Sequence, residues 1–183
     1  VISVILLFVA PILTMRLLAE EARSGTLELL MTAPVRDWEV VVGKFLAAFI
    51  FLTAMLLPTL AYLFLLMMVG APDVPVTLSG YLGIILFGAM LISFGLLTSA
   101  MSANQIVAAI LGIALSITIW LVGGFATTLD GPLGRLFAHL SAQTHLRDFT
   151  LGLITSANII YFLSGTAAGL FVAVRVLEVR RWR

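Results

Sequence analysis

The chain alternates between long apolar stretches and short polar breaks. Three intervals contain no Asp, Glu, Lys or Arg: residues 45–72, 74–129 and 149–174. The first and last each match one membrane-spanning helix of about 20 residues. The middle interval has 56 residues. As one helix it would extend about 84 Å, far beyond a hydrocarbon core of about 30 Å, so it must turn back once.

The polar break inside the middle interval contains Ser99 and Ser102-Ala103-Asn104-Gln105, and it predicts a tight turn there. The predicted spans are about 1–15, 45–69, 80–101, 105–128 and 154–175. The first span is an apolar run shorter than the roughly 20 residues that cross a bilayer, so we expect it to be clipped, with further sequence before Val1. The pattern predicts an all-α polytopic membrane protein with a single transmembrane domain over residues 1–183.

Charge is concentrated in residues 16–44, which hold four of the ten Lys/Arg and five of the nine acids. The C-terminal tail holds four more basic residues, and only Arg135 and Arg147 lie elsewhere. Four complete spans separate the charged loop from the tail, which places both on the same side of the membrane. By the positive-inside rule, we expect that side to be cytoplasmic.

Composition excludes several classes of protein. The chain is 62% hydrophobic and 10% charged, with no cysteine and two histidines, and its mean hydropathy is +1.19. A soluble domain carries about a quarter charged residues. Disulfides, thiol catalysis and cysteine-ligated metals are excluded. No charge lies deep in a predicted span, which argues against ion-coupled transport and against an intramembrane acid/base enzyme. We therefore predict no catalytic, cofactor-binding or metal-binding residues.

The charged loop has signals for helices along the membrane surface. Gly25 permits a sharp turn, and Thr26 is a candidate cap for a short helix that ends at Pro34. Asp37 is a candidate N-cap for the helix that leads into the next span, with Glu39 near its positive end. Two interpretations remain open: an interfacial connector that anchors the fold, or a surface that binds a soluble partner.

The segment 130–153 is expected on the opposite side of the membrane. Leu133, Leu136, Phe137 and Leu140 follow helical spacing and predict a surface helix. His139 and His145 are six residues apart, which does not place them on one helix face, so we interpret them as interfacial polar residues rather than a metal site. Gly165-Thr166-Ala167-Ala168-Gly169 suits close helix packing, within the chain or at a dimer seam, and we favour the first.

The charged loop also resembles a known family. Ala-Glu-Glu-Ala-Arg-Ser-Gly-Thr-Leu-Glu-Leu-Leu-Met-Thr-Ala-Pro-Val at residues 19–35, followed by Trp38 and Gly43-Lys44, resembles the cytoplasmic loop of ABC-2-type ABC transporter permease subunits. Within these it is similar to the gliding-motility-type permeases. The resemblance continues in Leu57-Pro58-Thr59, in Asn104-Gln105-Ile106-Val107-Ala108 and in Tyr161-Phe162-Leu163-Ser164.

The resemblance implies a six-helix ABC-2 permease fold, of which five transmembrane helices are visible here. It also implies extracytoplasmic interfacial helices within 130–153 and a cytoplasmic coupling helix within the loop 16–44 that docks on a separate ATPase subunit. The residues implied in ATPase coupling are Glu20, Glu21, Arg23, Gly25, Thr26, Leu27, Glu28, Leu29 and Leu30. The chain has no G-x-x-x-x-G-K-[ST] phosphate loop, so ATP is expected to bind the partner and this chain to carry no cofactor.

These observations predict the membrane-spanning permease subunit of an ABC transporter, an exporter of lipidic, amphipathic or polymeric cargo. The expected partners are an ABC ATPase subunit, a second permease copy or paralogue, and membrane lipid, with no nucleic acid. The expected location is a bacterial or archaeal plasma (inner) membrane. The alternative is a non-transporting scaffold that anchors an ATPase or a motility or division complex. In an exporter, ATP hydrolysis by the ATPase depends on a transported substrate and on the membrane spans, whereas in a scaffold it does not.

Overall fold

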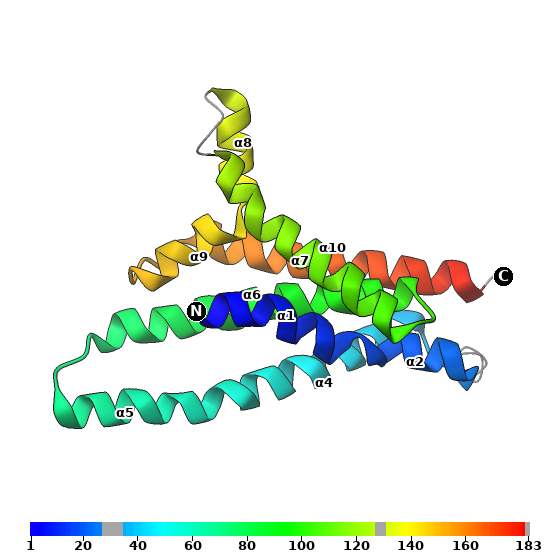
Figure 1. The fold of residues 1–183 in the computed structure, drawn as a ribbon, viewed down its shortest axis with the longest axis horizontal. Coiled ribbons are helices and arrows are strands. Elements are labelled where there is room, and N and C mark those ends of the chain that lie inside the picture. The colour runs from blue at the N-terminus through cyan, green and yellow to red at the C-terminus, as the bar shows by residue number, and fades with distance from the viewer. Residues whose placement is uncertain (27–34, 127–130, 182–183) are drawn as a thin grey trace.

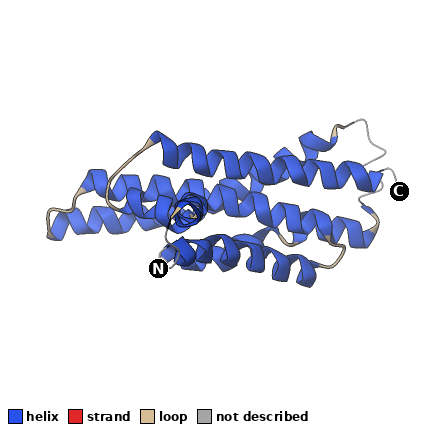
Figure 2. Ribbon diagram, turned by 90° about the horizontal axis from the view of Figure 1, so that it is seen from above, coloured by secondary structure: helices blue, strands red, loops and turns tan. Residues whose placement is uncertain are grey.

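The regular elements in the described part of the chain are helices (Figure 1). The computed structural model describes residues 1–26, 35–126 and 131–181. The elements within these ranges are α1 (Ile2–Thr14), α2 (Arg16–Ser24), α4 (Asp37–Leu56), the 3-10 turn η1 (Leu57–Thr59), α5 (Leu60–Val69), α6 (Val74–Met101), α7 (Gln105–Ala126), α8 (Pro132–Leu140), α9 (Ala142–Thr150) and α10 (Ser156–Arg181). Figure 2 shows helices and loops alone across this part of the chain. The predicted all-α fold class is confirmed.

Five helical segments of the described chain are long and apolar enough to cross a membrane: Ile2–Ser24, Asp37–Val69, Val74–Met101, Gln105–Gly124 and Ser156–Arg180. The prediction of five transmembrane helices is therefore confirmed. The third segment, which is α6, is 67% buried inside the protein, whereas the other four are 17–39% buried. Helix α6 is therefore the central helix, and most of the other four segments lies at the outer surface of the bundle.

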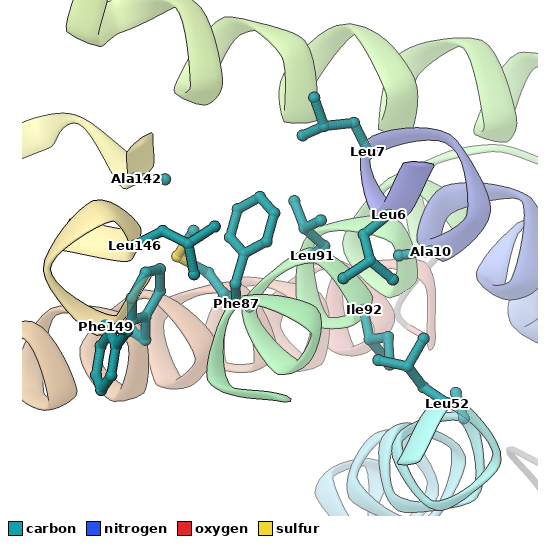
Figure 3. Packing of buried hydrophobic residues seen from close by; sticks show 13 residues of the cluster. Leu6, Leu7, Ala10, Leu52, Phe87, Leu91, Ile92, Ala142, Leu146 and Phe149 are labelled. Atoms are coloured by element: carbon teal, nitrogen blue, oxygen red, sulfur yellow. The ribbon is translucent and has the colours of Figure 1, made fainter. Parts of the chain in front are cut away.

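The main core surrounds the middle of α6. Figure 3 shows residues from α1, α4, α6 and α9 converging there. Phe87 of α6 contacts Phe162 of α10 edge to face, with ring centroids 6.0 Å apart, and Trp120 of α7 at 5.6 Å. Phe149 of α9 lies 6.2 Å from Phe162. Aromatic pairs at these separations contribute favourably beyond the area they bury, so this cluster fixes α9 and α10 against α6.

The two glycines of the G-x-x-x-G motif pack within the chain. A Cβ at Gly165 would lie 2.6 Å from the sulfur of Met90, and one at Gly169 would lie 2.5 Å from Ser93 Oγ. Both partners belong to α6. Small residues let two helix backbones approach closely in a membrane, and here they seat α10 on α6. The favoured intramolecular interpretation is therefore confirmed.

The start of α4 differs from the sequence prediction. The N-cap is Arg36 rather than Asp37, which is the first helical residue. The Glu39 side chain accepts a hydrogen bond from the Arg36 backbone N–H at 3.0 Å. In a capping box, the side chain of the third helical residue accepts a hydrogen bond from the backbone N–H of the N-cap residue. Glu39 makes this bond here. Further along the same span, the 3-10 turn η1, which contains Pro58, interrupts the α-helical backbone.

Helices α8 and α9 lie at the end of the bundle opposite α2 and are tied to α10 by a polar network. Asn158 of α10 is 3% exposed, and its Nδ2 donates to Asp148 Oδ2 at 2.9 Å. Its Oδ1 lies 2.6 Å from His145 Nδ1, while His145 Nε2 lies 3.0 Å from the backbone oxygen of His139. The His145 ring also stacks on Tyr161, with centroids 4.1 Å apart. The two histidines are therefore structural neighbours within a hydrogen-bond network.

Replacement of Asn158 by leucine is expected to lower the free energy of unfolding by about 1–3 kcal/mol, because His145 and Asp148 would each lose a partner in a partly buried site. The measurement is the thermal unfolding midpoint of the purified protein in detergent. Ser164→Ala is the control, since the Ser164 hydroxyl is exposed and bonds only to the Tyr161 carbonyl of its own helix. Equal midpoints for the two variants would contradict a structural role for the network.

Candidate functional site

Most of the fixed charge gathers at one end of the bundle. We call this the charged end: α2, the first turns of α4, the last turns of α6, the turn Ser102–Asn104 and the last turns of α10, at the right of Figure 1. A buried apolar cluster holds these helices together. Its members are Leu18 of α2, Val41 of α4, Leu96 and Ala100 of α6, and Ala173 and Leu177 of α10. The charged end is therefore a packed unit rather than a loose loop.

An ion pair joins α2 to α4. Glu21 Oε1 accepts from Lys44 Nζ at 2.5 Å, and the two side chains are 30% and 20% exposed. The other carboxylate oxygen of Glu21 is buried without a hydrogen-bond partner among the described residues. Partial burial reduces the screening that makes exposed pairs weak, so this pair contributes more than a surface salt bridge. It fixes the angle at which α2 leaves the bundle.

The chain turns sharply after α2. Gly25 has φ +73°, in the left-handed region where only glycine is free of a Cβ penalty, and it ends the helix. The Ser24 hydroxyl donates to the Glu20 carbonyl at 2.9 Å and lies 2.9 Å from the Thr26 hydroxyl. The predicted turn at Gly25 is confirmed.

A polar cleft lies between α2 and the turn that joins α6 to α7. Its volume is about 500 Å³, and it is lined by Arg23, Ala103, Asn104, Gln105 and Ile106. Arg23 and Asn104 are both exposed. A cleft with one cation and an amide at its rim offers polar contacts to a partner, but no pair of groups suited to proton transfer or nucleophilic attack.

The predicted coupling residues are distributed unevenly. Glu20 and Arg23 are exposed on α2, Glu21 is engaged by Lys44, and Gly25 and Thr26 form the turn. The remaining four, Leu27, Glu28, Leu29 and Leu30, lie outside the described residues, as does the rest of the short helix predicted up to Pro34. Among the described residues there is no group of three His, Asp or Glu side chains that would hold a metal ion.

Sequence reasoning missed two residues of this site. Lys44 was noted for its charge and within the Gly43-Lys44 motif, but the reach of its side chain back to Glu21 depends on the fold. Ser99 was assigned to the break between two spans. The structure places it inside α6, where it is fully buried and its hydroxyl faces the junction of α1 and α2. The sequence did contain a signal for Ser99: an unpaired hydroxyl in an apolar membrane helix is costly, so a serine at this position is expected to have a hydrogen-bond partner.

Comparison with known proteins identifies the family of the chain. A family model described as "ABC-2 family transporter protein" matches residues 1–174. No curated protein and no solved structure matches the chain. The matched region includes the membrane-spanning candidates up to Val174 of α10, and those parts of the charged end that belong to α2, α4, α6 and the turn after α6.

Proposed function

The chain belongs to the ABC-2 family of transporter membrane proteins, and on this premise we propose that its charged end docks on an ABC ATPase and passes the motion of that ATPase to the spans. Membrane subunits of this family lack an ATPase domain, and ATP is handled by a partner. The protein is a multi-pass membrane protein. We also propose that it belongs to the gliding-motility-type subgroup, which the Ala19–Val35 signature supports.

The observation that carries the proposal is the attachment of α2. This helix leaves Glu20 and Arg23 exposed, while its Leu18 and Ala19 are packed inside the protein and are 1% and 0% exposed. Its ion pair to Lys44 ties it to α4. A helix with one charged exposed face and one fully packed face is suited to receive a soluble partner and to transmit force. The segment from Gly25 to Leu30, which follows directly, completes the proposed docking surface.

Orientation is part of the proposal. The charged end faces the cytoplasm, where an ATPase and its ATP are found, and α8 and α9 lie on the outer side of the membrane. The supporting argument is the distribution of basic residues: eight of the ten Lys/Arg belong to residues 16–44 and the C-terminal tail. The membrane is the plasma membrane of a bacterium or archaeon, and a second copy or a paralogue completes the transmembrane unit.

The proposed activity is export of a lipidic, amphipathic or polymeric cargo. No Asp, Glu, Lys or Arg occurs in 45–72, 74–129 or 149–174. A path through these segments offers no fixed charge to bind or repel an ion. Apolar or extended molecules are the substrates that such a path accommodates best. Transport of a small inorganic ion alone would contradict this assignment.

The docking surface is tested by co-purifying the full-length protein with an ABC ATPase subunit encoded beside it. The wild type is expected to form an ATP-hydrolysing complex. Thr26→Arg/Glu28→Arg is expected to lose the complex, because it places bulk and positive charge on the docking surface. Gln143→Arg/Thr144→Arg is the control, since it adds charge at exposed positions of α9 at the opposite end.

Each outcome of this test has a definite meaning. Loss of the complex only in the loop variant supports docking at the charged end. A complex that survives the loop substitutions places the docking surface elsewhere. A wild type that binds no ATPase overturns the proposed coupling. Binding of an ATPase whose turnover depends neither on added lipid nor on the spans would favour the scaffold.

A further inference from the structure

A hydroxyl group from the central helix occupies the joint between α1 and α2. Ser99 Oγ of α6 accepts the backbone N–H of Leu18 at 3.1 Å and that of Ala19 at 3.0 Å. It donates to the backbone oxygen of Met15 at 3.0 Å. The contacts link residues about 80 positions apart in the chain. All four residues are buried or half-buried.

These bonds replace a cap that the local sequence does not provide. The first N–H groups of a helix have no partner within it, and a serine at the N-cap normally accepts one of them. The N-cap of α2 is Met15, which makes no side-chain cap bond. Ser99 performs this task from another helix. A side chain inserted at such a joint is also a recognised cause of a break between helical segments, and here the helix is interrupted at Met15.

The surrounding contacts make the attachment of α2 to α6 rigid. Leu18 packs in the buried cluster with Leu96 and Ala100 of α6, which lie three residues before and one residue after Ser99. On the α1 side of the joint, Thr14 lies against Gly95 so closely that a Cβ there would overlap its hydroxyl. The first turn of α2 therefore cannot shift relative to α6 without breaking three hydrogen bonds and a packed apolar contact.

We propose that Ser99 is the positioning residue through which α2 and α6 move as one body when the ATPase moves α2. The proposal rests on the proposed function, since it takes the ATPase as the source of motion. Force applied at the exposed face of α2 then reaches the most buried span of the bundle directly.

The rigid link is tested by measuring one distance in the complex with the ATPase. The chain has no cysteine, so spin labels attach only at introduced sites. Arg16→Cys places a label on α2, and Leu78→Cys places one near the other end of α6; both positions are exposed. The distance is recorded by pulsed electron paramagnetic resonance in lipid nanodiscs, without nucleotide and with ATP plus vanadate.

In the otherwise unchanged protein, the distance is expected to be the same in both nucleotide states. In Ser99→Ala it is expected to change or broaden with nucleotide, because α2 follows the ATPase without α6. Thr98→Val is the matched control: among the described residues the Thr98 hydroxyl bonds to the Gly95 carbonyl of its own helix and to no other helix, and this variant is expected to behave like the parent.

A nucleotide-dependent distance in the parent would overturn the proposal, and so would an unchanged distance in Ser99→Ala. The parent measurement remains decisive if Ser99→Ala does not assemble. Failure of the proposed function is a separate result, since it appears as absence of an ATPase complex with the unlabelled wild type before any distance is measured.

Discussion

Gly95→Ala is expected to be the most damaging single methyl addition near the joint of α1 and α2. A Cβ at this position would overlap the Thr14 hydroxyl and would lie 3.2 Å from Thr14 Cβ and 3.3 Å from the backbone Cα of Pro11. Thr14 is fully buried, and a threonine side chain has few alternative rotamers. Because neither neighbour can retreat, the helix α1 itself must shift. We expect a loss of about 3 kcal/mol, at the upper end of overpacking costs.

The measurement is the yield and thermal midpoint of monodisperse protein after size exclusion in detergent. Gly80→Ala is the matched control, because Gly80 lies on the same helix and a Cβ there would meet nothing within 4 Å. That variant is expected to remain within about 0.5 kcal/mol of the wild type. Equal midpoints for the two alanine variants would show that α1 does not pack on α6 at Gly95.

Lys44→Glu is expected to release α2 from α4 and to lose the ATPase complex. The substitution removes the partner of Glu21 Oε1 and places a second carboxylate beside a group whose other oxygen is already buried with no partner among the described residues. Like charges at such separations repel, and a partly buried charge left without its partner is costly. The expected loss is about 2 kcal/mol or more of local stability, which is sufficient to free α2 from its fixed position.

The charge swap Glu21→Lys/Lys44→Glu tests whether the pair itself matters. It restores opposite charges at the same two positions, so it is expected to recover much of the complex that Lys44→Glu loses. Glu178→Lys is the control for stability alone, because it breaks the exposed pair of Glu178 with Arg175, whose side chains are 36% and 61% exposed. Its effect on stability is expected to be below about 1 kcal/mol. Co-purification with the ATPase is the readout, and a swap as defective as the single variant would argue against the pair.

The spans and the charged loop are properties that the sequence alone defines well. Long intervals without charge predict membrane helices because a bilayer tolerates few charges, and this constraint acts on each segment separately. The turn at Gly25 was also predictable, since its cause is local: glycine adopts the left-handed conformation that ends a helix. The family resemblance followed from the same loop, where the residues are polar and therefore distinctive.

The Arg36 cap shows where local reasoning reaches its limit. Asp37 is the better capping residue by type, and the sequence contains both a cap candidate and an acidic third-position candidate. The structure shows that Glu39 reaches back to Arg36. The helix can begin after Arg36 or after Asp37, and these two starts differ by one residue. Helix boundaries are uncertain by that amount when only the sequence is considered.

The sequence by itself determined that this protein is helical, crosses a membrane and carries its charge at one end, because hydropathy and charge act residue by residue. Only the tertiary structure decided that α6 is the central helix, that Lys44 reaches Glu21, and that Ser99 caps α2 from about 80 positions away. These facts depend on which helix faces pack together. Apolar faces that meet protein and apolar faces that meet lipid have similar composition, so the pattern along the chain does not distinguish them.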